Sequence, residues 1–548
     1  MPEPGATTRK LPEFGQKIAA FGFTRLDART FTNRLEDAMS RAVPLPGDPE
    51  HRSSPAETAA CALVAALGAL LAAAPVLRVY FHDDDFLHLF QIANFGPLEF
   101  ITTPNAGNMY LVRNSVLFLN FVVFGMHAGA YLAGLVATHV ANVLLLFVLV
   151  RRLTGSSRIA CLGALLFAVC PTNDGTLGWY SVHGHALVAL FVLAGLLLLV
   201  PRHDDPAPMT TGRALCVALC MLAASQCWGS GIAAAFLTTV AAALLRPDAF
   251  RSRGTAAMLL AVPVLVALAM AALYVPRTEI NRDPMRSIDV LARSAVDWGH
   301  VLPMVGHTLS LGIVTLVLGA AYPPDRYPNA VSVATTAAFA LAALWALRRG
   351  SPLARRRLLA FLILALGAYA IVAAGRAAFL ASIQPNALMH AYVAATRYHY
   401  LPQVLLTIVL CLVLAEASRR LSPTSRTTGA LLAVWVVWSF TSVTVLRTPV
   451  ARFDPVRDLV ARQRDAITRA VLTQAPGTTV CLPNEPTPVS VGFPGTVGIF
   501  MLFNHEDALE GRRVYFVSSD PGVLAMREQG GRLGSLLLPA DACPPRTG

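Results

Sequence analysis

Long apolar runs recur along the chain and constrain its fold more than any other feature. About eleven of them are long enough to cross a bilayer, because about 30 Å of hydrocarbon takes about 20 helical residues. They cover residues 58–79, 128–150, 158–172, 180–200, 211–227, 229–246, 255–275, 330–347, 358–378, 401–418 and 429–446. A backbone in hydrocarbon must satisfy its own hydrogen bonds, so each run is expected to be a helix. The sequence therefore predicts an all-α polytopic membrane protein with about 11 transmembrane helices.

Composition and charge exclude two other classes of protein. Of the 548 residues, 55% are hydrophobic and only 14% are charged, which is far more apolar surface than a soluble enzyme needs. The formal net charge of +12 would suit a nucleic-acid partner if the cations lined one surface. The arginines instead stand in short segments between the apolar runs. We interpret them as topology signals and expect no nucleic-acid partner.

The arginine segments also predict the orientation, because positively charged short loops stay in the cytoplasm. The N-terminal segment, residues 1–56, has no signal peptide and is expected to be cytoplasmic. From there, eleven spans place every arginine segment inside and the C-terminus outside. A crossing at 301–320 would break this parity, so we expect a re-entrant or surface-lying element there. The alternative is a true crossing that is offset by another span.

The remaining chain divides into external loops and one polar domain. The transmembrane domain is expected to cover residues 57–446, with external loops at 79–124, 276–329 and 380–400. Residues 447–548 have the composition of a soluble domain, with a helix expected at 455–473 and strands at 478–482, 513–517 and 533–538. This predicts a small α/β domain on the external face. Outside the cytoplasm, its Cys481 and Cys543 could form a disulfide.

An acidic cluster follows the first apolar run directly. Asp83, Asp84 and Asp85 are consecutive, and His88 comes four residues after Asp84, which is the same face of a helix. Neighbouring carboxylates raise the pKa of at least one of them, so the cluster could supply a general base. Asp84, Asp85 and His88 could also hold a divalent cation. The alternative is that these residues cap the helix and face solvent.

A second polar motif precedes a later apolar run. It reads Thr396-Arg397-Tyr398-His399-Tyr400-Leu401-Pro402. An arginine at headgroup level can bind phosphate through two parallel hydrogen bonds. Arg113 and Arg376 are the other cations expected on the external face. Tyr398 and Tyr400 could support such a site, although tyrosines are common at a membrane interface without any catalytic role.

Taken together, these motifs resemble the GT-C superfamily of glycosyltransferases, especially protein O-mannosyltransferases and bacterial enzymes of that architecture. The acidic pair of that superfamily, which follows the first transmembrane helix, is matched by Asp84-Asp85-Phe86. Later matches, in order, are Arg113, Phe124-Gly125, His139 with Asn142, Phe167 to Pro171 with Trp179 and Ser181, and Arg397 to Pro402. The resemblance covers residues 57 to about 446. Asn114 stands where many relatives carry proline, and Gln226-Cys227-Trp228 lacks an acidic residue that the family often has.

The resemblance implies an inverting transfer of a sugar from a polyprenyl-phosphate carrier on the external face of a bacterial inner membrane. The acceptor would be a glycan, lipid or protein. Asp84 would be the base, and Asp83 and Asp85 would tune its pKa or hold a divalent cation. Arg397 would bind the donor phosphate, with Arg113 and Arg376 as weaker candidates and His88, Tyr398 and Tyr400 in support.

Three other functions remain open at this point. A transporter or flippase for a lipid-linked saccharide would favour broken helices at mid-membrane and related halves. An O-antigen polymerase or ligase would concentrate its function in a large late external loop. A non-catalytic scaffold could share the GT-C frame. In this chain the charged residues collect on one face instead, which argues against a transporter. The acidic cluster stands directly after the first span and not in a late loop, which favours the transferase over the polymerase or ligase.

Overall fold

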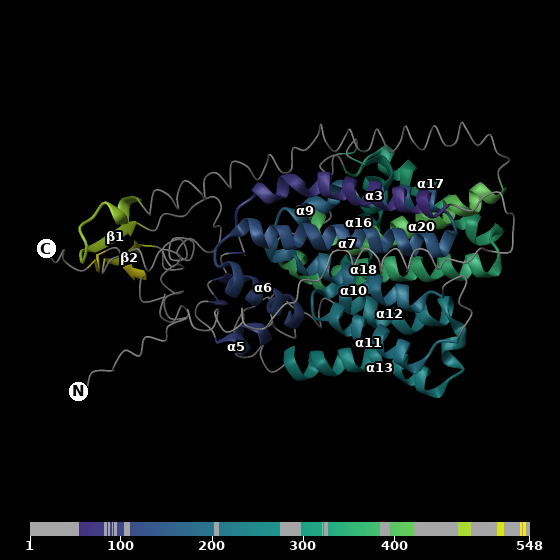
Figure 1. Ribbon diagram of the computed structural model, residues 1–548, viewed down its shortest axis with the longest axis horizontal. Coiled ribbons are helices and arrows are strands. Elements are labelled where there is room, and N and C mark those ends of the chain that lie inside the picture. Colours follow the sequence, from purple (N-terminus) through teal and green to yellow (C-terminus); the bar gives the residue numbers. More distant parts are fainter. Residues whose placement is uncertain are drawn as a thin grey trace.

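A computed structural model of the chain is mostly helical. It describes residues 54–81, 85, 88–89, 91–92, 96–103, 110–201, 208–274, 298–319, 322, 327–383, 395–420, 469–483, 512–519, 537–539 and 541–543. The helices lie side by side in one bundle (Figure 1). The prediction of a polytopic helical protein is confirmed at this level.

Most of the predicted apolar runs are helices. The α-helices are α3 (Pro55–Ala73), α5 (Pro97–Thr102), α6 (Leu111–Phe124), α7 (Ala128–Thr154), α8 (Ser157–Ala168), α9 (Asp174–Leu177), α10 (Gly184–Leu199), α11 (Thr211–Ser225), α12 (Gly229–Leu245), α13 (Arg253–Ala269), α16 (Trp298–Leu318), α17 (Ala330–Arg349), α18 (Pro352–Ile383) and α20 (Tyr400–Arg420). Short 3-10 helices are η2 (Ala74–Arg78), η3 (Pro171–Asn173), η4 (Tyr180–Val182), η5 (Pro247–Phe250) and η10 (Thr396–His399), and η6 (Met270–Tyr274) is a π-helical turn.

The number of helices that could span a membrane is smaller than the sequence predicts. Within the described residues, 8 helices are long and apolar enough to cross, and a bent pair, Ser157–Ala168 with Pro171–Leu177, would make a ninth. Two of the predicted spans, α11 and α12, have 15 and 17 residues. The predicted span at 429–446 lies outside the described residues.

The segment expected to be re-entrant begins with a continuous helix, α16. Its 21 residues are long and apolar enough to cross a membrane. Val301 packs beside Tyr398, and Gly312 accepts a hydrogen bond from Gln403 of α20. The Tyr327 hydroxyl, after the end of α16, lies 2.9 Å from His307 Nδ1. The re-entrant path and the true crossing both stay predictions.

Arginines gather at the opposite end of the bundle, where they satisfy the carbonyls of several helix C-termini. Arg357 Nη1 donates to the Leu153 carbonyl at 2.7 Å, and Arg152 Nη1 donates to the Leu197 carbonyl at 2.7 Å. Arg420 donates to the Arg349 carbonyl. The last carbonyls of a helix have no partner within it and carry partial negative charge, so a cation stabilises them. The arginines that predict topology therefore also hold α7, α10, α17, α18 and α20 together.

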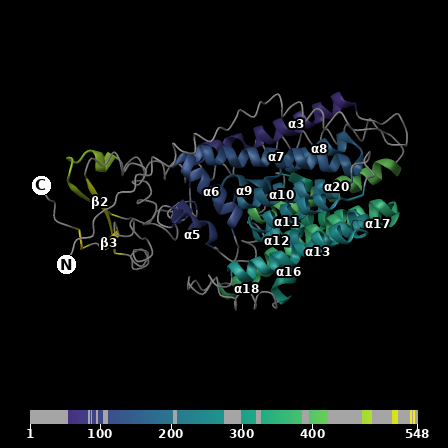
Figure 2. The same cartoon turned by 60° about the horizontal axis from the view of Figure 1, so that its bottom comes forward.

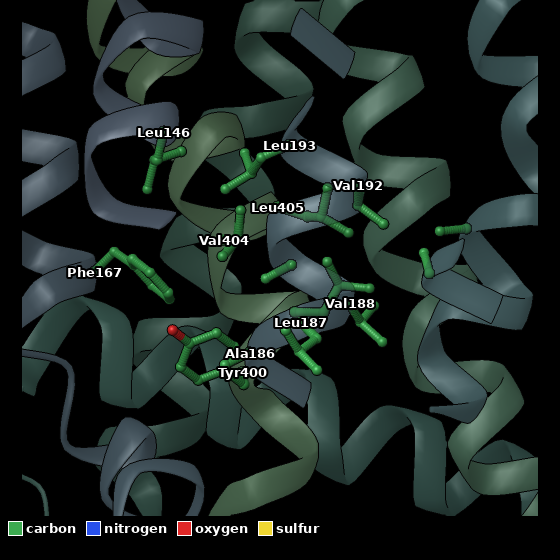
Figure 3. Packing of buried hydrophobic residues seen from close by; sticks show 14 of the residues in the cluster. Leu146, Phe167, Ala186, Leu187, Val188, Val192, Leu193, Tyr400, Val404 and Leu405 are labelled. Atoms are coloured by element: carbon green, nitrogen blue, oxygen red, sulfur yellow. The ribbon is translucent and has the colours of Figure 1, made fainter. Parts of the chain in front are cut away.

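One continuous hydrophobic core fills the bundle. Phe167, Tyr400 and Leu405 are among its fully or nearly fully buried side chains, and they lie beside residues of α7 and α10 (Figure 3). Leucines of α3, α13 and α17 are exposed instead, with Leu341 at 66%. Large exposed apolar side chains on outer helices are expected where lipid is the solvent.

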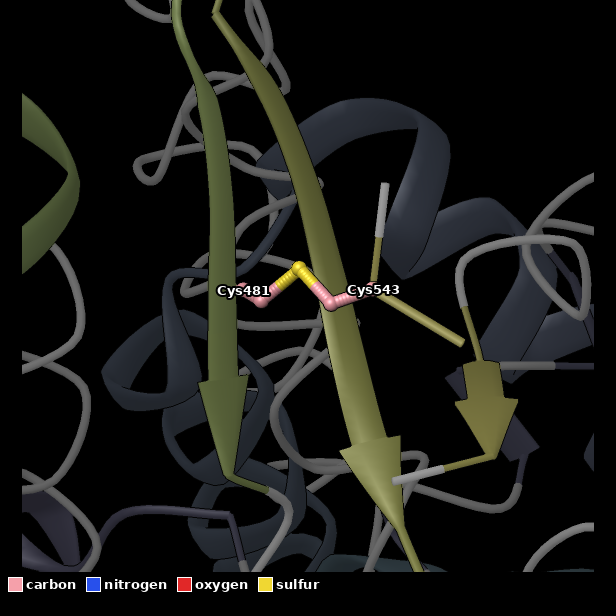
Figure 4. The surroundings of a disulfide bond; sticks show 2 residues. All are labelled: Cys481 and Cys543. Carbon is pink, nitrogen blue, oxygen red and sulfur yellow. A yellow bond between two sulfur atoms is a disulfide. The ribbon is translucent and has the colours of Figure 1, made fainter. Parts of the chain in front are cut away.

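The polar C-terminal region contains three short strands at or near the segments where the sequence predicts them, and they form a parallel sheet. Its strands are β1 (Thr479–Pro483), β2 (Arg513–Ser518) and β3 (Leu537–Pro539), in that order across the sheet. Cys481 and Cys543 form the expected disulfide, with 6.2 Å between their Cα atoms (Figure 4). The sheet lies at the end of the bundle where α5 and α6 lie (Figure 2). The predicted helix at 455–473 falls almost entirely outside the described residues.

Candidate functional site

Asp85, the last residue of the acidic cluster, is buried against the start of the α10 region. Its Oδ1 accepts two hydrogen bonds from Ser181, one from the backbone N–H and one from the hydroxyl, both at 2.6 Å. The two residues are 96 positions apart, and Asp85 is only 4% exposed. Burying a carboxylate requires such compensation. This pair therefore ties the segment that follows α3 and η2 to η4.

Arg113 binds the same residue from the other side. Its Nε and Nη2 donate to the Ser181 carbonyl at 3.2 and 2.6 Å, and its Nη1 donates to Asn114 Oδ1 at 2.9 Å. The guanidinium also lies 4.8 Å from the centre of the Tyr110 ring. Arg113 is 3% exposed. Its donors are thus used by the protein itself, and Arg113 is a positioning residue more than a free phosphate ligand.

Asn114 binds the end of α5 through its side-chain amide. Its Nδ2 donates to the carbonyl of Phe100 at 3.0 Å and to that of Thr103 at 3.3 Å. Phe100 belongs to the last turn of α5 and Thr103 is its C-terminal cap, so the amide binds the end of this short helix, where few carbonyls have a partner within the helix. A proline at this position could not make these bonds. The asparagine therefore fixes α5 beside α6.

Arg397 stands between two aromatic rings. Its Cζ lies 5.1 Å from the centre of the Trp179 ring and 4.9 Å from that of Tyr398, which is a cation–π arrangement on both faces. The side chain is partly exposed. Within the part of the chain that the structure describes, no group accepts a hydrogen bond from it. The two rings hold the planar fork in position, and among the described residues its N–H donors have no acceptor, which would suit the binding of an anion.

Gly175 allows the Arg397 segment to approach α9. A Cβ at this position would lie 2.1 Å from Thr396 Oγ1 and 2.7 Å from the Arg397 backbone nitrogen. Both distances are shorter than non-bonded atoms tolerate, and the second atom belongs to backbone that cannot turn aside. Only glycine therefore permits this contact between α9 and η10.

His88 is buried and does not face solvent. It is 4% exposed, and its Nδ1 lies 3.2 Å from Gln91 Oε1. Burial, and next the positive charge of Arg113, lower the pKa of His88 well below its usual value of 6.5. The imidazole is consequently neutral at neutral pH. The alternative of a solvent-facing histidine is excluded.

The other members of the Arg397 motif pack between helices. Tyr400 is fully buried, and its hydroxyl lies 2.7 Å from His139 Nδ1 and accepts a hydrogen bond from Asn142 at 3.3 Å. His399 Nδ1 lies 2.9 Å from the Tyr369 hydroxyl. These polar contacts join α20 to α7 and α18, so Tyr400 supports the site by fixing the helix that follows it.

Three of the predicted site residues are not placed. Asp83 and Asp84 lie outside the described residues, and Arg376 lies in α18 with a side chain that is outside them as well. Among the described His, Cys, Asp and Glu side chains, no group of three could hold a metal ion. A site that includes Asp83 or Asp84 stays a prediction.

Two neighbouring residues bring the predicted motifs together. Ser181 binds Asp85 and Arg113, and Trp179, two positions earlier, stacks on Arg397. Segments near residues 85, 113 and 397 therefore meet at one short turn after α9. The sequence motifs include Trp179 and Ser181, but the sequence assigns them no role, because no local pattern indicates which distant residues they contact.

Comparison with the models of known protein families, with curated proteins and with solved structures finds no match for this chain. The site is therefore interpreted from its own geometry.

Proposed function

We propose that the chain is a membrane glycosyltransferase that moves a sugar from a polyprenyl-phosphate carrier to an acceptor hydroxyl on the external face of a bacterial inner membrane. The observation that carries the proposal is the meeting of the acidic loop and Arg397 at the turn from Trp179 to Ser181. A transfer of this kind needs a carboxylate for the acceptor and a cation for the departing phosphate within one site.

Each group then has one task. Asp84 takes the proton of the acceptor hydroxyl, whose oxygen attacks the anomeric carbon of the sugar from the face opposite the carrier. The bond from that carbon to the phosphate oxygen breaks, and polyprenyl phosphate leaves with the electron pair. Arg397 stabilises the charge on the departing phosphate. Asp85 and Arg113 hold the loop by binding Ser181.

The position of Arg397 supports its assignment over that of Arg113. Arg113 is 3% exposed and already donates to two protein oxygens, so a phosphate would have to break those bonds. Arg397 is partly exposed, and within the described residues it is held by the rings of Trp179 and Tyr398. A guanidinium fixed in this way loses little further freedom when it binds an anion.

The test of the reaction compares membrane glycoconjugates of deletion and wild-type cells by mass spectrometry. A sugar that is missing in the deletion strain should return with the wild-type chain and stay missing with Asp84→Asn or Arg397→Ala. An Arg348→Ala variant, which changes an exposed arginine at the other end of the bundle, serves as the matched control. Full restoration by Asp84→Asn would refute the base assignment, and no missing sugar would refute the transferase.

The test of the donor site uses polyprenyl phosphate as the probe, since the sugar is not known. Native mass spectrometry of the purified chain should show binding that Arg397→Ala weakens by about tenfold or more, because a charge-assisted bidentate pair is lost. Arg397→Lys should bind with intermediate affinity, since it keeps the charge and loses the planar fork. Equal binding by the parent and Arg397→Ala would exclude Arg397 as the phosphate ligand.

A further inference from the structure

A pocket opens at the arginine-rich end of the bundle, far along the helices from the site described above. Its volume is about 170 Å³, and it lies between the end of α7, the start of α18 and the end of α20. Arg152, Arg357 and Arg419 line it together with one carboxylate, that of Glu416. The proposed transfer reaction uses none of these residues.

The charges in this pocket do not balance. Glu416 Oε1 accepts a hydrogen bond from Arg420 at 2.6 Å, and its Oε2 lies 3.6 Å from Arg419 Nη1. One carboxylate thus serves two arginines. Arg357 donates to the neutral carbonyl of Leu153, and no carboxylate in the described part of the chain pairs with it. Among the described side chains of the lining, the arginines therefore outnumber the carboxylate, and an anion would offset this difference.

The first turn of α18 adds to this positive potential. The helix begins at Pro352, and Ser351, Leu353 and Ala354 line the pocket. Ser351 Oγ accepts the Ala354 N–H at 3.2 Å. The N-terminal end of a long helix carries partial positive charge and favours an anion beside it. It acts here in the same pocket as the two arginines.

The rest of the wall is apolar. Leu358 on α18, Leu412 on α20 and Ala346 on α17 form a buried apolar floor, and Leu353 at the start of α18 is an apolar lining residue that is 50% exposed. A small hydrated anion would gain nothing from this wall, whereas an acyl chain would bury apolar surface against it. A pocket with cations at the headgroup level and an apolar wall below them suits a lipid.

We infer that this pocket binds the headgroup of an anionic phospholipid of the leaflet at the arginine-rich end, with the lipid phosphate between Arg357 and Arg419. The acyl chains would begin at the exposed Leu353. The lipid would link α7, α18 and α20 through a negative charge that adds to that of Glu416, the one carboxylate of the described lining. The site is distinct from the donor site, and it does not depend on the proposed reaction.

The experiment measures lipid binding to the full purified chain by native mass spectrometry, with phosphatidylglycerol, phosphatidylcholine and inorganic phosphate as separate probes. Phosphatidylglycerol should bind and raise the melting temperature, and phosphatidylcholine should not. Arg419→Gln and Arg357→Gln should each weaken binding by about fivefold to tenfold, since each removes one cation near the headgroup. Arg348→Gln, which removes an exposed arginine outside the pocket, should leave the affinity unchanged.

Arg419→Gln is the decisive variant, because the Arg419 side chain is 55% exposed and its loss should not disturb folding. Unchanged phosphatidylglycerol binding in Arg419→Gln and in Arg357→Gln would overturn the proposal. Inorganic phosphate that binds as tightly as the lipid would overturn the assignment to a lipid. Arg397→Ala should leave phosphatidylglycerol binding unchanged, and Arg419→Gln should leave polyprenyl phosphate binding unchanged, so failure of either proposal is recognised separately.

Discussion

Single side chains in this protein carry charge into places where water is excluded. Asp85 and Arg113 are 4% and 3% exposed, and both bind the one residue Ser181. A buried charge is tolerated when hydrogen bonds replace its hydration, and breaking one partner leaves the other uncompensated. The contacts at Ser181 should therefore control the stability of the first loop as well as the geometry of the site.

Replacing Arg113 with lysine should destabilise the protein although the charge is kept. A lysine cannot donate two parallel hydrogen bonds to the Ser181 carbonyl while it also reaches Asn114. The expected loss is about 1.5–3 kcal/mol, the usual contribution of hydrogen bonds to a charged group. Thermal unfolding of the purified variant measures it. Arg251→Lys, at an exposed arginine, is the control, and equal melting temperatures for both variants would contradict the prediction.

His88 should make the protein less stable in mild acid. Burial and Arg113 lower the pKa of His88 in the folded chain below 6.5, so only the unfolded chain takes up a proton as the pH falls below that value. Stability is therefore full above about pH 6.5 and is lost progressively below it. Melting temperatures should change little from about pH 7.5 to about pH 6.5 and then fall toward about pH 5, less steeply for His88→Gln. His127→Gln, at an exposed histidine, should keep the parent slope.

At the scale of elements, apolar length predicted the helices well and their ends poorly. Runs of one hydrophobic character become helices because the backbone has no other partner in hydrocarbon. The same rule does not determine where a run is cut, and α11 and α12 are shorter than a full span although their composition is apolar. Contacts between elements could not be predicted from the sequence. Asp85 and Ser181, for example, are 96 residues apart, and no local pattern pairs them.

The contact between α9 and η10 should be required for the site and not for the bundle. In Gly175→Ala the new Cβ would collide with Thr396 and with the backbone of Arg397. η10 must therefore move away, which separates the Arg397 guanidinium from the Trp179 ring. We expect polyprenyl phosphate binding to fall by about tenfold with little change in the melting temperature. Gly134→Ala, where a Cβ meets no atom within 4 Å, is the matched control. Parent-like binding in Gly175→Ala would show that the contact does not position Arg397.

At the scale of the whole molecule, the two ends of the bundle differ. Arginines bind helix C-termini at one end, and α5, α6 and the disulfide-bonded sheet lie at the other (Figures 1 and 2). Composition alone indicated this separation, since the arginine segments and the polar domain are visible in the sequence. The structure adds that an arginine of one segment donates to a carbonyl at the end of a helix from another part of the chain. The sequence does not indicate which arginine contacts which helix.

This separation gives a prediction about orientation in the membrane. The positive-inside rule places the arginine end in the cytoplasm, so α5 should face the outside. A membrane-impermeant maleimide should label Leu98→Cys, at a side chain of α5 that is 75% exposed, in cells with an opened outer envelope and an intact inner membrane. Arg348→Cys should react only after the inner membrane is disrupted, with the unsubstituted chain giving the background from its free cysteines. The reverse labelling order would place the Asp85 and Arg397 site in the cytoplasm, where an external transferase could not act.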